Sequence, residues 1–255
     1  MFGLSPVQFN DLVTALIPHW QKVEYQRKTS RPRVRKVGAG RKYVLSFPQM
    51  LAMQLLYLRT YTPYVFVGLV FGIDDGSVTR YFQKLRPLLY QKMKSLTIKK
   101  IALSEEEILE LIADATEQET ERRDGSGYSG KKKKQTVKTQ LVVDRAGQIR
   151  HVSSSVPGNQ HDKKLYDKTG VTAGLGDLGY LGTDMTVPFK SSKLHQLTKK
   201  QKIYNHLHSR VRIVVEHVLA TLKQFRILSQ RWRNNLKYYN QIFVIVAGIY
   251  NYRRA

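Results

Sequence analysis

The 255-residue chain contains no cysteine, so disulfide bonds, cysteine-ligated zinc sites and cysteine nucleophiles are excluded. It is also short of acids, because 43 lysine and arginine residues stand against 19 aspartate and glutamate residues, a formal charge of +24. Long hydrophobic runs are missing too: the longest, at residues 64–73 and 242–250, are too short to span a bilayer. The start of the chain lacks the basic segment and apolar run of a signal peptide. These absences favour a cytoplasmic or nuclear protein.

The basic residues that remain favour a polyanionic partner, either a nucleic acid or an anionic membrane surface. They concentrate at residues 28–42, 131–134 and 226–237. One such cluster alone could be a solvated face or a flexible loop, whereas three together favour contacts with phosphates. The clusters lack an amphipathic anchoring helix, which disfavours the membrane. Trp232, between Arg231 and Arg233, suits either a DNA-contacting surface or a core position.

The first part of the chain reads as helical. Residues 1–26 suggest a pair of short helices, and residues 28–43 a polar, basic linker. Residues 46–97 give a helix from Ser46, a break at 62–63, a second short apolar run, a turn at 73–77 and a longer amphipathic helix. This order is typical of a helix-turn-helix, with a plain three-helix bundle as the alternative. On the last helix Thr79, Arg80 and Lys84 are predicted to point outward, where they could enter a major groove.

The second part predicts an α/β domain with a mixed sheet. Ser104 and Glu107 fit a capping box, and an apolar strand follows with Asp114 near its end. After a loop at residues 122–135 come alternating strands at 136–143 and 148–156 with a hairpin turn between them, and a helix at 159–169. Short strands at 174–178 and 185–189 and a long helix at 198–228 complete the domain. We therefore expect two domains, residues 1–100 and 101–255.

Isolated acids are conspicuous in so basic a chain. Asp114 and Asp177 are each predicted to end a strand, and Glu216 lies in the long helix. Carboxylates at strand ends can project into a cleft, and their oxygens suit Mg²⁺ or Mn²⁺. Two such ions about 4 Å apart can clamp the attacking and leaving oxygens of a phosphodiester. Each acid alone could equally serve as a helix cap or in a surface salt bridge.

Helical periodicity places Arg212 and Lys223 on the same stripe as Glu216, within roughly 40° at about 100° per residue. The apolar residues of this helix lie on a separate face. The stripe could hold phosphates beside a metal, or it could be an exposed ladder of ion pairs. A zinc site at His206, His208 and His217 is disfavoured, because the spacing is not a standard one and no cysteine assists.

Several words in the sequence occur in the order of a known family. They are IADATEQ, YSGKKKKQTVKTQLVVD, VPGNQHDKKLYD, GDLGYLG, LTKKQKIYN and RVRIVVEHVLATLKQFRIL, and they cover nearly all of residues 112–233. This stretch resembles the DDE transposases of bacterial insertion sequences, in the insertion-sequence-five group related to Harbinger transposases. The upstream stretch LSFPQMLAMQLLYLRTYTPYVFVGLVFGI resembles the helix-turn-helix domain of that family.

The resemblance implies an RNase H-like catalytic domain with a triad of Asp114, Asp177 and Glu216 that holds two divalent ions, Mg²⁺ or Mn²⁺. Arg212 and Lys223 match the two cations of the family's signature around its glutamate and would position phosphates. His161 and Asp162 match another family word and could support the metal ligands from behind. Asp162 is the rival of Asp177 as second ligand, but the GDLGY context favours Asp177.

The implied function is transposition. The helix-turn-helix would bind the terminal inverted repeats of an insertion sequence, and the catalytic domain would cut the element ends and join the 3′-OH ends to target DNA. Pairing two ends requires at least a homodimer on double-stranded DNA, in the cytoplasm at the bacterial nucleoid. The alternatives are a metal-dependent endonuclease that does not join DNA and an inactive, domesticated DNA-binding protein. The expected DNA-contacting residues are Thr79, Arg80, Lys84, Lys131, Lys132, Lys133, Lys134, Arg231 and Arg233.

Overall fold

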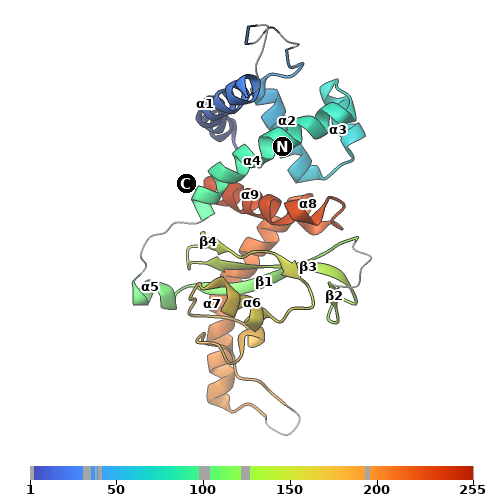
Figure 1. The fold of residues 1–255 in the computed structure, drawn as a ribbon. Coiled ribbons are helices and arrows are strands. Elements are labelled where there is room, and N and C mark those ends of the chain that lie inside the picture. The colour runs from blue at the N-terminus through green and yellow to red at the C-terminus, as the bar shows by residue number, and fades with distance from the viewer. Residues whose placement is uncertain are drawn as a thin grey trace.

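A computed structural model describes residues 3–30, 36–37, 39, 42–97, 104–121, 127–192 and 196–254. Figure 1 shows a helical part that is separated from a β-sheet by the C-terminal helices. The helical part contains α1 (Pro6–Thr29), α2 (Phe47–Thr60), α3 (Tyr64–Phe71) and α4 (Asp75–Thr97). The remaining elements are α5 (Glu105–Leu109), β1 (Ile112–Glu119), β2 (Tyr128–Ser129), β3 (Lys134–Val143), β4 (Ile149–Val152), β5 (Val156–Pro157), α6 (Asp162–Thr169), the 3-10 helix η1 (Leu178–Tyr180), α7 (Lys199–Lys223), α8 (Arg226–Ser229), the 3-10 helix η2 (Leu236–Tyr238) and α9 (Tyr239–Tyr252).

Helix α1 corrects the predicted pair of short helices, because it runs unbroken through Pro18. A proline inside a helix removes one backbone hydrogen bond. Leu16 before it and Trp20 after it are both buried, so packing holds the two halves in one line. The predicted linker at 28–43 falls largely outside the described residues.

The helix-turn-helix prediction is confirmed by α2, α3 and α4. Ser46 and Gln49 form a capping box that starts α2. The helix ends at Tyr61, whose φ of 52° is left-handed. Asp74 accepts a hydrogen bond of 2.7 Å from the backbone N–H of Ser77 and so starts α4. Val67 and Val78 are fully buried where α3 and α4 pack together.

The sheet is built around β3. Strand β1 pairs with it antiparallel along its whole length, from Ile112 opposite Val143 to Glu119 opposite Thr136. Strands β4, β5 and β2 are also antiparallel to β3. Beyond β1, single parallel bridges join Ile112 to Leu175 and Leu175 to Thr186. The sheet is therefore mixed, as expected, although its parallel part consists only of these bridges.

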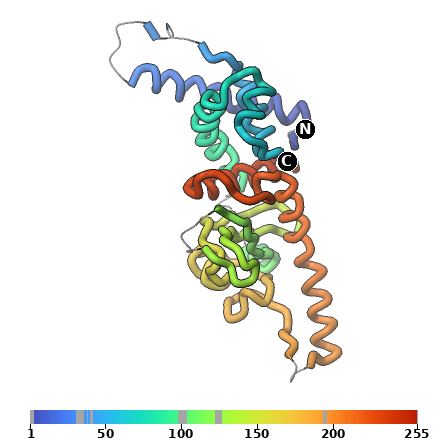
Figure 2. The backbone as a smooth tube through the Cα atoms, turned by 90° about the vertical axis from the view of Figure 1, so that its right-hand side faces the viewer, coloured from blue at the N-terminus to red at the C-terminus, as the bar shows by residue number. Residues whose placement is uncertain are grey.

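The two faces of the sheet pack against different helices. Ile112, Leu141 and Val143 belong to a core that includes buried residues of α7 and α9. Ala113 and Val142, on the opposite face, pack with Tyr166 of α6 and Tyr180 of η1. Helix α7 thus covers one face of β1 and η1 lies against the other, so the edge of the sheet at β1 runs between them. Figure 2 shows α7 running past the sheet and projecting beyond it.

Three predictions at strand ends need correction. The segments 174–178 and 185–189 form isolated bridges rather than strands. Asp177 therefore does not end a strand but caps η1, where its side chain accepts from the N–H of Gly179. Asp114 is the third residue of β1, which continues to Glu119 because Thr116 and Gln118 are buried as well.

Helix α9 ties the helical part to the sheet, since it contacts both α4 and β4. Residues of α1, α2, α4, β3, α7 and α9 share one continuous core. The position of the helix-turn-helix relative to the sheet is thus fixed by packing. Among the described helices, none is long and apolar enough to cross a membrane.

Candidate active site

Asp114 and Asp177 lie at the same level of two neighbouring chain segments. Leu175 pairs with Ile112 in a parallel bridge, and each aspartate comes two residues after its bridge residue. Residues two apart in extended chain point to the same side. The pKa of the Asp114 carboxyl is raised mainly by burial, and the charge of Asp177 adds to that effect. The sheet edge thus brings together two of the three predicted ligands.

The Asp114 carboxyl is largely buried, with 18% of its side chain exposed. Burial raises its pKa to about 6, although Arg212 and the N–H of Ala115 oppose this shift and the charges of Asp177 and Asp162 add to it. The N–H of Ala115 donates to Asp114 Oδ1 over 2.7 Å. A cation beside Asp114 would favour its ionised form.

Arg212 of α7 lies between the first and third predicted ligands. Its Nη2 is 3.7 Å from Asp114 Oδ2 and 3.9 Å from Glu216 Oε1. The Arg212 side chain is 15% exposed, whereas that of Glu216 is 57% exposed. The predicted polar stripe on α7 therefore faces Asp114, and the buried residues Val215 and Val218 face the core as expected. Lys223, the last residue of α7, is exposed two turns after Glu216.

Asp162 lies beside Asp177. A Cβ on Gly179 would be 2.7 Å from Asp162 Oδ2 and 2.9 Å from Asp177 Oδ1, so both carboxylates border this glycine. The charge of Asp162 also raises the pKa of Asp114. His161 is exposed at the N-cap of α6. Asp162 is thus a neighbour of Asp177, and the structure does not force a choice between these two acids as the second ligand.

The donor set fits a hard divalent cation. Asp114, Asp177, Asp162 and Glu216 offer carboxylate oxygens, which Mg²⁺ and Mn²⁺ prefer. Burial is the main cause of the raised pKa of Asp114, and repulsion from Asp177 and Asp162 adds to it; positive charge would relieve this repulsion. In the part of the chain that is described, no three acidic or histidine side chains form a ready cluster around one point.

The helix-turn-helix exposes one of its three predicted DNA-contacting residues. Arg80 is 67% exposed, and Thr79 is partly buried with its hydroxyl bonded to the carbonyl of Asp75. Lys84 does not point outward as predicted. It donates to Tyr43, lies 3.4 Å from Glu24 of α1 and is half-buried. Helix α1 covers this part of α4, which helical periodicity alone cannot show.

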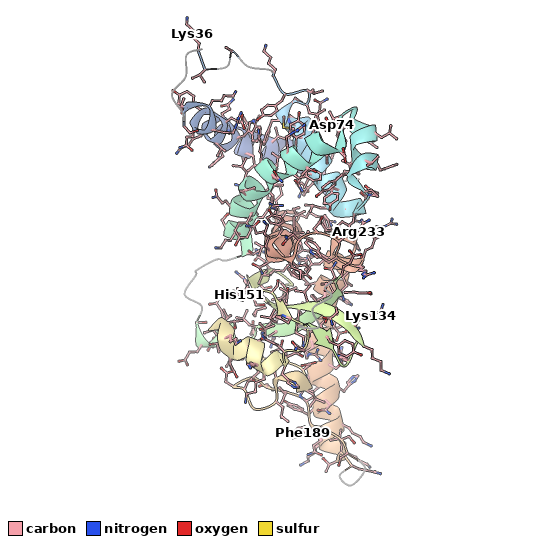
Figure 3. The ribbon with its side chains drawn as sticks, turned by 45° about the vertical axis from the view of Figure 1, so that its right-hand side comes forward. Lys36, Asp74, Lys134, His151, Phe189 and Arg233 are labelled. Atoms are coloured by element: carbon pink, nitrogen blue, oxygen red, sulfur yellow. The ribbon has the colours of Figure 1, made fainter. Side chains whose placement is uncertain are left out.

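The other predicted basic residues gather on one side of the molecule. Lys131, Lys132 and Lys133 form the turn between β2 and β3, and Lys134 starts β3. Lys134 and Arg231 both contact Glu119, at 2.7 and 3.8 Å. Figure 3 shows Lys134 and Arg233 projecting from the same side.

Trp232, between the two arginines, is a core residue. It is 1% exposed and stacks on Tyr61 of the helix-turn-helix. The guanidinium of Arg233 lies over the Tyr61 ring and also donates to the Tyr61 carbonyl. This segment therefore connects the two halves of the molecule, and Arg231 is its freer cation.

The three histidines do not converge. His208 is buried, and its Nε2 pairs with the carbonyl of Thr186 at 3.0 Å. His206 and His217 are exposed on α7.

Two residues of the site were not singled out from the sequence. Lys138 is buried in β3 and donates to Asp162 Oδ1. Tyr180 is fully buried, and its hydroxyl has no hydrogen-bond partner among the residues described. Burial and the charges of Asp162, Asp114 and Asp177 raise the pKa of Tyr180. The one sequence feature that could have pointed to Lys138 is its position, since it is a lysine in the middle of a strand whose neighbouring residues are buried.

Comparisons with known proteins match both halves of the chain. Residues 113–251 match the family described as DDE superfamily endonuclease, and residues 43–95 match the helix-turn-helix of DDE superfamily endonuclease. Endonucleases of this superfamily generally use divalent metal ions.

Two named relatives are similar over most of their length. The chain is 33% identical, over its whole length and 93% of the relative, to a probable transposase for insertion sequence element IS702 of Microchaete diplosiphon. It is 28% identical, over 89% of the chain and 83% of the relative, to a putative transposase for insertion sequence element IS112 of Streptomyces albus G. No solved structure matches. The family matches, together with the first of these relatives, show that the chain belongs to the DDE superfamily endonucleases and carries their helix-turn-helix domain.

Proposed function

We propose that this enzyme is the transposase of an insertion sequence. It binds the terminal inverted repeats of its element, cuts the DNA at the element ends and joins the 3′-OH ends to target DNA. The observation that carries the proposal is the meeting of Asp114 and Asp177 at the sheet edge, with Glu216 across Arg212. The helix-turn-helix at the other end of the chain and the names of the two relatives support the same function.

Asp114, Asp177 and Glu216 are the residues that would hold two divalent cations, Mg²⁺ or Mn²⁺. When bound, such ions supply an activated water and neutralise charge on the leaving oxygen. The carboxylates must be ionised to serve as ligands. Asp114, whose pKa burial raises to about 6 in the absence of a cation, must therefore be free of its proton when it binds one.

Neither step needs a covalent protein intermediate. In cleavage, the oxygen of water bonds to phosphorus and the bond from phosphorus to the 3′ oxygen breaks. In joining, the oxygen of the freed 3′-OH bonds to a phosphorus of the target DNA and gives up its proton. The bond from that phosphorus to the target strand's own 3′ oxygen breaks, and this oxygen leaves as a new 3′-OH. When DNA binds, Arg212 contacts phosphate oxygens in place of the Asp114 and Glu216 carboxylates. Lys223 contacts another phosphate of the DNA backbone.

The proposed DNA path crosses both halves of the molecule. Arg80 and Thr79 on α4 contact the inverted repeat. The turn at residues 131–134 and Arg231 neutralise phosphates next to the cleavage point. Two copies of the chain, each holding one element end, form the active assembly on DNA.

The test is a combined cleavage and joining assay. The protein is incubated with Mg²⁺, a labelled duplex of its element's end and a supercoiled target plasmid. Wild type is expected to cut and join. Asp114→Asn, Asp177→Asn and Glu216→Gln are expected to reduce both products by about a thousandfold or more, because each removes one ligand of the proposed centre.

Glu106→Gln is the matched control, since this exposed acid lies in the first turn of α5. It is expected to retain both activities. Cleavage without joining would reduce the proposal to an endonuclease. Tight binding with neither product would indicate a protein that keeps only its DNA contacts.

A further inference from the structure

Lys138 is a buried lysine in the middle of the central strand. It is 7% exposed, and its side chain leaves β3 on the face that α6 covers. Its Nζ donates to the carbonyl of Gln160 over 2.7 Å and to Asp162 Oδ1 over 2.8 Å. Glu117 Oε1 lies 3.3 Å away. A buried ammonium group is tolerated only with such partners.

Glu117 fixes Lys138 from the neighbouring strand. The two residues face each other directly in the pairing of β1 and β3. Burial raises the pKa of Glu117, but hydrogen bonds from Ser129 and Thr136 and the charge of Lys138 outweigh this, so its pKa lies below the ordinary value. Glu117 therefore stays charged and balances Lys138 independently of Asp162.

Asp162 uses its two oxygens differently. Oδ1 accepts from Lys138, while Oδ2 borders Gly179 together with Asp177 Oδ1. Because Lys138 is held by Glu117 and by the carbonyl of Gln160, it cannot follow a freely rotating carboxylate. The position of Asp162 Oδ2 is thus set by the lysine.

Gly179 leaves the room that this arrangement needs. A side chain there would come within 3.0 Å of both carboxylates, at 2.7 and 2.9 Å. The buried hydroxyl of Tyr180 experiences the charges of Asp162, Asp114 and Asp177 together. All three aspartates are therefore within electrostatic range of Tyr180, and Asp162 and Asp177 also share the border of Gly179.

We propose that Lys138 is a positioning residue which holds Asp162 beside Asp177, so that Asp162 supplies a fourth carboxylate to the cation-binding centre. The inference rests on the proposed function, because it concerns the same cations. It assigns Glu117 the task of anchoring the lysine. If the contacts of Lys138 with Glu117 and Asp162 only stabilised the fold, neutralising these residues would leave the affinity for cations unchanged.

The test is Mn²⁺ binding to the full-length protein, followed by electron paramagnetic resonance of the free ion. Asp162→Asn keeps the shape and an acceptor for Lys138 but removes one negative charge. It is expected to weaken Mn²⁺ binding by about tenfold or more, as loss of a group supporting a metal site does. Asp167→Asn, an exposed acid on the same helix, is the matched control and is expected to bind like wild type.

The positioning role is tested by the double variant Glu117→Gln with Lys138→Met. It removes one positive and one negative charge, so the local net charge is unchanged while Asp162 loses its donor. Mn²⁺ binding is expected to fall by about fivefold or more in the folded protein, because the carboxylate is no longer held in place. Thermal unfolding of the same samples reports any separate loss of stability.

The outcomes separate this inference from the proposed function. Asp177→Asn serves as the benchmark for the centre itself. If Asp177→Asn weakens Mn²⁺ binding while Asp162→Asn and the double variant bind like wild type, the role of Lys138 and Asp162 is overturned and the function stands. If Asp177→Asn also binds like wild type, the metal centre is wrong, and the inference fails with it.

Discussion

At the scale of single residues, Asp114 links the stability of the fold to the needs of the reaction. Its burial raises the pKa to about 6, against 3.8 for the ordinary carboxyl. Between these two values the folded chain binds more protons at this site than the unfolded chain does. The free energy of unfolding therefore decreases as pH rises through that window. Asp114, the proposed metal ligand, is thus ionised at neutral pH at a cost in stability.

We expect Asp114→Asn to be more stable than wild type at pH 7, without metal, by about 3 kcal/mol, since the pKa is raised from 3.8 to about 6 and one pKa unit corresponds to about 1.4 kcal/mol. At pH 4, where the native carboxyl is protonated, the advantage should vanish. Urea unfolding at both pH values measures this. Asp167→Asn is the control and should show no such pH-dependent gain. An Asp114→Asn variant that is equally or less stable at pH 7 would contradict the burial argument.

The sequence could predict most acids of the site but not their supports. Asp114, Asp177 and Glu216 are recognisable because carboxylates are scarce in this chain and stand in family words. Lys138 could not be predicted, because nothing in the sequence shows that α6 will bring Asp162 within hydrogen-bond distance of it. Lys84 fails for a similar reason, since its partner Glu24 is sixty residues away. Which charges pair is decided by tertiary packing.

At the scale of elements, local signals located the starts of α2 and α7, but they divided α1 into two helices and joined α7 to α8. The capping boxes at Ser46 and Thr198 mark the starts of α2 and α7 within the chain itself. The short segments at 174–178 and 185–189 could not be resolved the same way. Each is bridged through one residue only: Leu175 pairs with both Ile112 and Thr186, and Thr186 pairs with Leu175 alone. A short run of alternating apolar residues therefore predicted more strand pairing than these segments form. Long-range pairing decides whether such segments become strands.

The contact of α9 with α4 depends on one glycine. A Cβ on Gly248 would lie 2.4 Å from Met93 Cβ and 2.7 Å from the Met93 carbonyl oxygen. We expect Gly248→Ala to lower the free energy of unfolding by about 1–3 kcal/mol through overpacking. This loss should exceed the gain of about 1 kcal/mol that alanine brings within a helix. Thermal and urea unfolding measure the change.

Gly130→Ala is the matched control, because a Cβ at that turn position meets nothing within 4 Å. It should unfold like wild type. A Gly248→Ala variant that is more stable than wild type would mean that helix propensity outweighs the close approach and that α4 and α9 separate easily.

At the scale of the whole molecule, the fold brings two of the basic clusters together, residues 131–134 and 226–237. The chain has a net formal charge of +24. Glu119 contacts both Lys134 of the β-hairpin and Arg231 of the segment after α8. That segment in turn stacks on the helix-turn-helix through Trp232 and Tyr61. The path from the helix-turn-helix to the hairpin is therefore continuous, and the common core makes it rigid.

The salt dependence of DNA binding tests this surface. Each phosphate contact contributes about 0.9 to the slope of log affinity against log salt concentration. We expect Lys131→Ala with Lys132→Ala to reduce the slope by about 2 on element-end and on unrelated DNA alike, because the proposed DNA path gives these exposed turn residues contacts with phosphates rather than bases. Fluorescence anisotropy over a salt series measures it. Lys164→Ala with Lys168→Ala removes the same charge from exposed positions of α6 and should leave the slope within error of wild type. If both pairs change the slope equally, the affinity comes from overall charge, and the DNA path through the hairpin is wrong.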